Sequence, residues 1–270
     1  MPKVKANGIE IFYEESGAGE PLLLIAGLAC DHANWFEVIP LLASRNRVVI
    51  FDNRGVGQSS SPETPYSIHQ MAEDTAGLLD AIGLARVNVA GHSMGGQIAV
   101  ELALNHPERV KSLTLLASCA RVDERGKAII ESWGDLPRLV DPVTGIRLSL
   151  PWIYTSRFYE TPGAIERVIK EMLSNPFPPS LSGIYQQSRA ITSFNALARL
   201  DAIECPTLVV VGDEDILGGL PFSRQLAQGI RGARLVVLEK AGHGLPTESP
   251  EATVAVMRDL LSTLEDTVGY

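Results

Sequence analysis

The chain has 270 residues, of which 45% are hydrophobic and 20% charged, and its formal net charge is −9 with a sequence pI near 5.1. This size allows one domain with a large core, and the acidic balance disfavours nucleic acid or an anionic membrane as a partner. The 3 cysteines lack metal-type spacing and predict reduced thiols. The start, Met1–Ala6, lacks the apolar stretch of a signal peptide, and no apolar run reaches the length of a membrane span. We therefore expect a cytoplasmic protein.

Apolar runs alternate with helical patterns along the chain, which indicates an α/β protein with a mostly parallel sheet. Alternating apolar residues over 9–14 predict an antiparallel edge strand. Continuous apolar runs predict buried parallel strands at 21–28, 47–51, 87–90, 112–118, 207–211 and 234–239. Helices are expected at 34–43, 68–82, 94–105 and 250–264. The tail, 265–270, looks loose.

The segment 122–198 has a different pattern, because prolines interrupt it repeatedly and it contains no long apolar strand. It predicts a lid inserted into a core made of residues 1–121 and 199–270. The lid segment holds half of the chain's aromatic residues, which favours an apolar chamber over the active site, although packing on the core would account for about half of these rings. We take Trp133, Trp152 and Tyr159 as candidate substrate-binding residues.

A G-x-S-x-G pentapeptide, Gly91–Gly95, directly follows the strand pattern at 87–90 and directly precedes the helix pattern at 94–105. A turn this sharp strains its middle residue and brings the positions two before and two after into contact, so both must be glycine. Such a turn lifts the hydroxyl of Ser93 above the sheet edge and aims the first amides of the helix at the group that it attacks. Ser93 is therefore the candidate nucleophile. The competing interpretation is a glycine-rich loop with an incidental serine.

A serine needs a histidine base and a group that orients the base. Of the 5 histidines, His243 lies in a glycine-flanked loop just after a strand pattern. His106 is interpreted as a helix cap and His92 as a packed support. The acid should follow another strand, and the run ending Gly-Asp-Glu-Asp offers Asp215, which we prefer, and Asp213, which we interpret as a solvated turn residue.

These motifs resemble those of the α/β-hydrolase superfamily, whose triad runs in the order Ser, Asp or Glu, His. The resemblance covers about 4–264 and implies an eight-stranded, mostly parallel sheet with helices on both faces and a helical lid between strands 6 and 7. It favours Asp215 over Asp213, because the family acid is usually the second aspartate of G-D-x-D. It also implies an oxyanion hole made by the backbone N–H groups of Leu28 and Met94. The turn Asp52–Ser59 resembles a family turn with a structural role.

The segment Ala26–His32 and the Asp52 turn are most similar to the 3-oxoadipate enol-lactonase and small-carboxylesterase branch of that superfamily. The resemblance implies a serine hydrolase for a small-molecule ester or lactone, acting through an acyl-enzyme on Ser93, with no cofactor and no metal. The same triad also suits a carbon–carbon bond hydrolase of ring-cleavage products or a cofactor-free haloperoxidase. A ligand-binding receptor that keeps the fold is the alternative from another class. A nucleophilic cysteine, Cys30 or Cys119, is the minor interpretation.

Overall fold

The computed structural model describes residues 2–265, so nearly all of the tail expected to be loose lies outside the described residues. Within this range one sheet of eight strands has the order β1-β2-β4-β3-β5-β6-β7-β8. Strands β3 to β8 pair in parallel, and β2 pairs antiparallel with β1 and β4. The strands are β1 (Lys3–Ala6), β2 (Ile9–Ser16), β3 (Glu20–Ile25), β4 (Asn46–Phe51), β5 (Val87–His92), β6 (Val110–Leu116), β7 (Thr207–Gly212) and β8 (Arg234–Leu238). The predicted mostly parallel eight-stranded sheet is confirmed.

The strand predicted at the edge is not the edge strand. It forms β2, but β1 pairs with its outer side, with Lys3 opposite Phe12. Strand β1 has 4 residues, too few to show an alternating pattern in the sequence. Lys3 and Lys5 place charge on this outermost strand, which discourages pairing with another chain.

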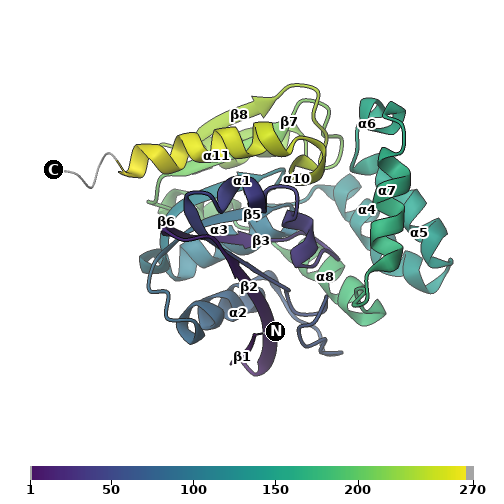
Figure 1. The fold of residues 1–270 in the computed structure, drawn as a ribbon, viewed down its shortest axis with the longest axis horizontal. Coiled ribbons are helices and arrows are strands. Elements are labelled where there is room, and N and C mark those ends of the chain that lie inside the picture. Colours follow the sequence, from purple (N-terminus) through teal and green to yellow (C-terminus); the bar gives the residue numbers. More distant parts are fainter. Residues whose placement is uncertain (1, 266–270) are drawn as a thin grey trace.

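Helices cover both faces of the sheet (Figure 1). One core contains buried side chains of α2, α3 and α9, and a second core contains those of α1 and α11 on the other face. The bounds of the helices outside the lid segment are α1 (Ile39–Leu42), α2 (Ile68–Ala81), α3 (Met94–Asn105), α9 (Leu220–Gly229), α10 (Leu245–Glu248) and α11 (Pro250–Glu265). No helix between residues 2 and 265 has the length and apolarity needed to cross a lipid bilayer.

The prediction of a single helix at 34–43 was wrong. The chain forms a 3-10 helix over His32–Trp35 and then the short α1. Pro40 lies in the first turn of α1. Because proline has no backbone N–H and its ring clashes with the carbonyl four residues earlier, a continuous helix through this position is disfavoured.

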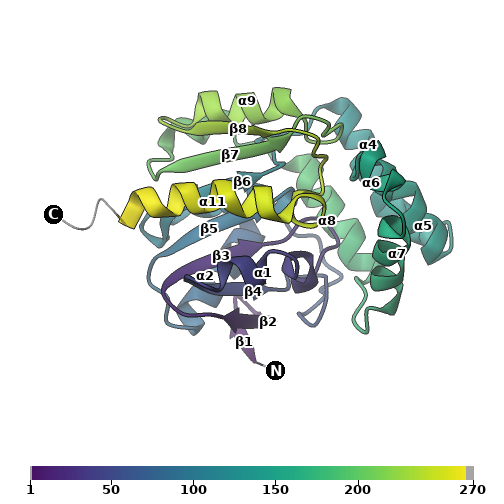
Figure 2. The same cartoon turned by 45° about the horizontal axis from the view of Figure 1, so that its top comes forward.

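The lid segment lies between β6 and β7 and forms α4 (Glu124–Asp135), α5 (Pro142–Ser149), α6 (Ser156–Glu160), α7 (Ala164–Ser174) and α8 (Leu181–Ser193). Figure 2 shows α4, α5, α6 and α7 beside one end of the sheet. The helices α4, α5, α6 and α8 are each capped by the residue that directly precedes them, whose side chain accepts a hydrogen bond from a backbone N–H of the first turn: Asp123, Asp141, Thr155 and Ser180. The prolines thus divide the lid segment into short helices, four of which have a side-chain cap at the N-terminus.

Candidate active site

Ser93 lies at the tight turn between β5 and α3. Its φ is 55° and its ψ −118°, a region that residues other than glycine rarely adopt. A Cβ on Gly91 would lie 2.2 Å from the carbonyl oxygen of Gly95, and a Cβ on Gly95 would lie 1.9 Å from that of Ile25. Neither position therefore accepts a side chain. The Ser93 N–H donates to the carbonyl of Leu116 on β6 (2.9 Å), which holds the strained turn on the sheet.

The structure brings Ser93, His243 and Asp215 together in a row. His243 Nε2 lies 3.0 Å from Ser93 Oγ, and His243 Nδ1 lies 3.0 Å from Asp215 Oδ2. Ser93 follows β5, Asp215 follows β7 and His243 follows β8, so the carboxyl ends of three strands of the parallel sheet place the three groups. The second carboxylate oxygen of Asp215 accepts hydrogen bonds from the N–H groups of Leu217 (2.9 Å) and Gly218 (2.8 Å). Both oxygens of the carboxylate are thus fixed in direction.

The two candidate acids differ in their surroundings. Burial acts to raise the pKa of Asp215, but the neighbouring His243 and the backbone N–H groups outweigh it and lower this pKa below its usual value. Asp215 is therefore a buried carboxylate at neutral pH. Asp213 is exposed, and its Oδ1 accepts from the N–H of Ala241 at 3.3 Å. The geometry therefore favours Asp215 as the partner of His243.

His92 supports the loop that carries His243. Its Nε2 lies 2.8 Å from the backbone carbonyl oxygen of His243, and its ring centre lies 5.3 Å from the ring centre of His243. Burial, and then the nearby His243, lower the pKa of His92 to about 4. His92 is thus a neutral imidazole that donates to the carbonyl, which agrees with its interpretation as a packed support.

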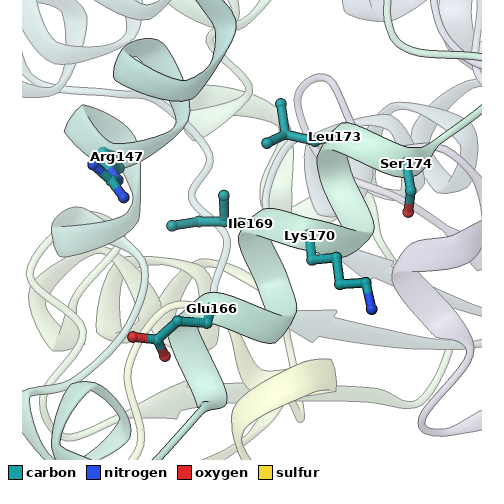
Figure 3. Close-up of a pocket in the computed structure, with 6 residues that line it drawn as sticks. All are labelled: Arg147, Glu166, Ile169, Lys170, Leu173 and Ser174. Atoms are coloured by element: carbon teal, nitrogen blue, oxygen red, sulfur yellow. The ribbon is translucent and has the colours of Figure 1, made fainter.

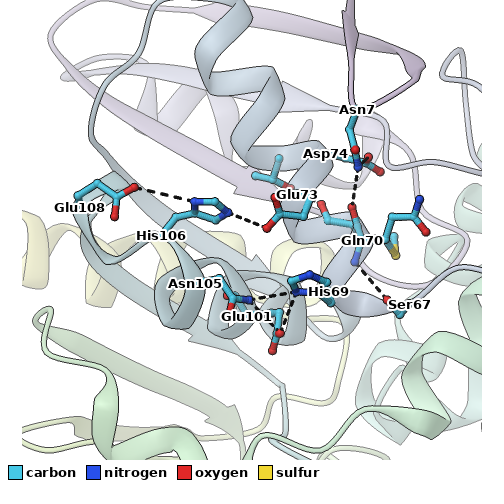
Figure 4. A network of polar contacts seen from close by, with 12 residues as sticks. Asn7, Ser67, His69, Gln70, Glu73, Asp74, Glu101, Asn105, His106 and Glu108 are labelled. Atoms are coloured by element: carbon cyan, nitrogen blue, oxygen red, sulfur yellow. Dashed lines mark hydrogen bonds and ion pairs between the residues drawn. The ribbon is translucent and has the colours of Figure 1, made fainter.

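Two other histidines, His69 and His106, have carboxylate partners on α2 and α3, away from Ser93. Figure 4 shows His69 on α2 facing Glu101 on α3, and His106 at the end of α3 facing Glu73 on α2. The distance from His106 Nε2 to Glu73 Oε1 is 2.7 Å. Both pairs tie α2 to α3, which is a structural role.

The turn that begins at Asp52 is held by backbone and side-chain contacts. Asp52 accepts hydrogen bonds from the N–H groups of His32 and Gln58, both at 2.8 Å. Arg54 pairs instead with the buried Asp74, with N···O distances of 2.5 and 2.6 Å. The two charged residues of the turn thus have different partners, and both brace loops at the carboxyl end of the sheet.

The loop after β3, which the resemblance assigns to the oxyanion, packs against the Ser93 turn. A Cβ on Gly27 would lie 3.2 Å from Ser93 Cβ. The N–H of Leu28 makes no backbone hydrogen bond within the described residues. The N–H of Met94 belongs to the first turn of α3, where N–H groups have no partner inside the helix. Both groups are therefore available beside Ser93.

The lid segment makes hydrogen bonds with the loops of Ala29, Arg54 and His243 near Ser93. Gln187 on α8 is 0% exposed, its Oε1 accepts from the N–H of Ala29 (2.8 Å), and its Nε2 donates to the carbonyl of Arg54 (2.9 Å). The carbonyl of Ile153 accepts from the N–H of His243 (2.9 Å). Neither Gln187 nor Ile153 was predicted from the sequence, because neither belongs to a motif. The signal that could have identified Gln187 is a glutamine on the core-facing side of a predicted helix.

A cavity of about 40 Å³ adjoins Ser93 and His243. Its other walls come from the turn and first helical turn after Ser93, from the ends of β6 and β7, and from the lid helices α4 and α8: Met94, Gln97, Ala117, Ser118, Cys119, Val122, Gly126, Ile130, Ile191, Leu217 and Gly218. Among the described residues, Trp133, Trp152 and Tyr159 are not part of these walls. Trp133 packs on the core, and Tyr159 is 40% exposed. Their substrate-binding role stays a prediction.

The two cysteines near the site are protonated thiols. Burial raises the pKa of both Cys30 and Cys119 to about 12; the charge of Asp31 adds to this for Cys30, whereas the hydrogen bond from Gln97 partly opposes it for Cys119. Since the thiolate is the reactive form of cysteine, the geometry does not favour a cysteine nucleophile.

A larger hollow of about 420 Å³ lies within the lid segment. Figure 3 shows its lining residues, of which Arg147 belongs to α5 and Glu166, Ile169, Lys170, Leu173 and Ser174 belong to α7. None of them is a residue of the Ser93, Asp215 or His243 loops. The hollow is wide and open, so its volume does not make it the reaction site.

Known proteins resemble this chain in sequence and in fold. A sequence model of the α/β hydrolase fold matches residues 20–250. The putative carbamate hydrolase RutD of Azorhizobium caulinodans is 32% identical over 252 residues, which cover 93% of this chain and 94% of that protein. The enol-lactonase of Burkholderia xenovorans LB400 has a TM-score of 0.88 at 28% identity, covering 97% of this chain and 100% of that one. A thermophilic esterase from Thermogutta terrifontis has a TM-score of 0.87 at 28% identity, covering 98% and 99%. The chain therefore belongs to the α/β hydrolase fold family, and it is a hydrolase.

Proposed function

We propose that the chain is a serine hydrolase that cleaves a small carboxylic ester or lactone through an acyl-enzyme on Ser93. The observation that carries the proposal is the row of two 3.0 Å contacts from Asp215 through His243 to the Ser93 hydroxyl. A serine placed in this way is activated by the histidine, and the histidine is oriented by the carboxylate. The names of the related esterase and enol-lactonase support this class of bond, and the carbamate hydrolase name extends it to carbamates.

In the first half of the reaction, Ser93 Oγ forms a bond to the carbonyl carbon as His243 Nε2 takes the hydroxyl proton. The oxyanion that results accepts hydrogen bonds from the N–H groups of Leu28 and Met94. When the carbon–oxygen bond to the leaving group breaks, His243 gives its proton to the departing alkoxide. In a lactone the alcohol stays attached to the acyl chain.

In the second half, His243 Nε2 takes a proton from water while the water oxygen bonds to the acyl carbon. The bond to Ser93 Oγ then breaks, Ser93 recovers its proton from His243, and the carboxylic acid leaves. Asp215 keeps the proton of His243 on Nδ1 throughout, and its negative charge stabilises the imidazolium formed in each half.

The cavity beside Ser93 favours a short, uncharged acyl group. Its walls contain no Lys, Arg, Asp or Glu within the described part of the chain, and most of them are apolar. Placing a carboxylate there without a cationic partner is unfavourable. A ring-cleavage dienoate carries such a carboxylate, so an ester or lactone suits the cavity better than that substrate of the carbon–carbon bond hydrolases.

Replacement of the nucleophile tests the mechanism. Ser93→Ala should lower kcat on a p-nitrophenyl ester by about four to six orders of magnitude, because removing one triad member disables the unit. A fluorophosphonate probe should label Ser93, and the Ser118→Ala variant should still be labelled, since the Ser118 hydroxyl donates to the Ser93 carbonyl (2.8 Å). If Ser93→Ala keeps more than about a tenth of the rate, the serine mechanism is wrong.

A substrate panel tests the bond class. The purified protein is assayed with p-nitrophenyl esters of two to twelve carbons, lactones, carbamates and ring-cleavage dienoates. We expect short esters or lactones to give the highest kcat/KM. Turnover of dienoates alone would assign the site to carbon–carbon bond cleavage, and binding without turnover of any compound would favour the receptor alternative.

A further inference from the structure

The cavity beside Ser93 contains one polar group that the proposed mechanism does not use. Gln97 lies four residues after Ser93 on α3, lines the cavity, and is 1% exposed. Its Nε2 donates weakly to the sulfur of Cys119 at 3.5 Å. Its Oε1 is buried and has no hydrogen-bond partner among the described residues.

An unpaired amide oxygen is unusual inside a protein. The great majority of buried polar atoms are hydrogen-bonded, because burying one without a partner is unfavourable, so each exception calls for an explanation. Side chains with such an atom in the described part of the chain are Asn34, Trp35, His92, Gln97, Arg109 and Ser223. Gln97 is the one among them that lines the cavity next to the candidate nucleophile.

The other polar groups of this cavity do not complete the bonding of Gln97. The Ser118 hydroxyl donates to the Ser93 carbonyl (2.8 Å), and the Ser93 hydroxyl faces His243 (3.0 Å). The Cys119 sulfur already accepts from the amide nitrogen of Gln97. The partner that the oxygen lacks must therefore be a donor from outside the chain.

We propose that Gln97 is a specificity-determining residue, whose Oε1 accepts a hydrogen bond from an O–H or N–H group on the acyl part of the substrate. The inference rests on the proposed serine hydrolase and names its substrate class, short acyl groups that carry a hydrogen-bond donor. Four residues of helix correspond to a rise of about 6 Å. The donor is thus a few bonds from the carbonyl carbon, as in a hydroxyacyl or acylaminoacyl ester.

The test compares substrates of matched size. Ethyl butanoate is the reference, ethyl 3-hydroxybutanoate offers an O–H, N-formylglycine ethyl ester offers an N–H, and ethyl 3-oxobutanoate offers only an acceptor. A pH-stat measures kcat/KM for each. The wild-type protein should favour at least one donor ester over ethyl butanoate by about tenfold or more, since a buried acceptor discriminates strongly against a substrate that leaves it unpaired.

The Gln97→Met variant keeps the length of the side chain but removes its amide. It should bring the ratio between donor ester and ethyl butanoate close to one, while its melting temperature stays at or above that of the wild-type protein. Gln97→Leu serves as a second variant with the same expected ratio. Ile191→Leu is the matched control, because it reshapes the same cavity without changing a hydrogen-bonding atom, and the donor preference should persist in it.

Three results would overturn the inference. The first is a wild-type protein that hydrolyses ethyl butanoate and the donor esters equally, and the second is a donor preference that survives in both Gln97 variants. The third is a preference for ethyl 3-oxobutanoate that disappears in Gln97→Met, because the amide nitrogen would then face the substrate. The proposed serine mechanism fails separately, through activity that persists in Ser93→Ala.

Discussion

The hydrogen bonds around the Asp215 carboxylate determine how replacement by asparagine would affect His243. Oδ1 of Asp215 accepts from two N–H groups, those of Leu217 (2.9 Å) and Gly218 (2.8 Å). An asparagine must keep its oxygen on these donors, so its NH₂ group faces His243 Nδ1. That nitrogen must then accept, which moves the imidazole proton to Nε2. A protonated Nε2 faces Ser93 Oγ and cannot take its proton.

Asp215→Asn should therefore lower kcat by about three to four orders of magnitude with little change in KM, because the tautomer of His243 is wrong while the cavity is intact. Initial rates with p-nitrophenyl acetate over a range of concentrations measure both constants. Asp213→Asn is the matched control, and its kcat should stay within about threefold of wild type, because Asp213 is exposed and its carboxylate accepts a hydrogen bond from the N–H of Ala241 rather than from His243. Equal losses in the two variants, or a larger loss in Asp213→Asn, would refute the assignment.

Three further predictions concern stability, the lid segment and specificity. The pKa of His92 is lowered to about 4 in the folded protein, so at this group the unfolded chain binds a proton first as pH falls. Its contribution to the free energy of unfolding should therefore drop by about 3 kcal/mol between pH 6.5 and pH 4. His92→Asn should weaken this dependence in urea titrations, and an unchanged pH slope would contradict it. Gln187→Leu leaves the Ala29 N–H without its partner and should lower kcat about ten- to a hundredfold, while KM stays within about threefold of wild type. Gln187→Glu keeps an acceptor for that N–H and should restore part of the lost kcat. An unaltered kcat in Gln187→Leu would mean that the contact does not position the loop. Trp152→Ala and Tyr159→Ala should shift the preferred acyl length by a graded amount, about 1 to 3 kcal/mol per methylene in relative kcat/KM, and an unchanged ester profile would make these rings ordinary packing.

Local sequence determines the elements that carry the chemistry. The spacing of Gly91, Ser93 and Gly95 between a strand pattern and a helix pattern dictates a turn that only glycine tolerates at its flanks, because a Cβ at either flank would overlap a backbone oxygen. Buried parallel strands have continuous apolar runs, so the sequence also predicts where the core strands lie along the chain. The sequence did not predict the edge strand β1, because 4 residues are too few to show an alternating pattern.

Tertiary structure alone decides which distant residues meet. Asp213 and Asp215 are alike as residue types in one loop, and only the packing of that loop buries Asp215 against His243 and leaves Asp213 exposed. The contact of Gln187 with the loop after β3 and the unpaired oxygen of Gln97 belong to no motif. They arise because helices distant in sequence close over the strand ends, where hydrogen-bond partners are set by three-dimensional proximity rather than by spacing along the chain.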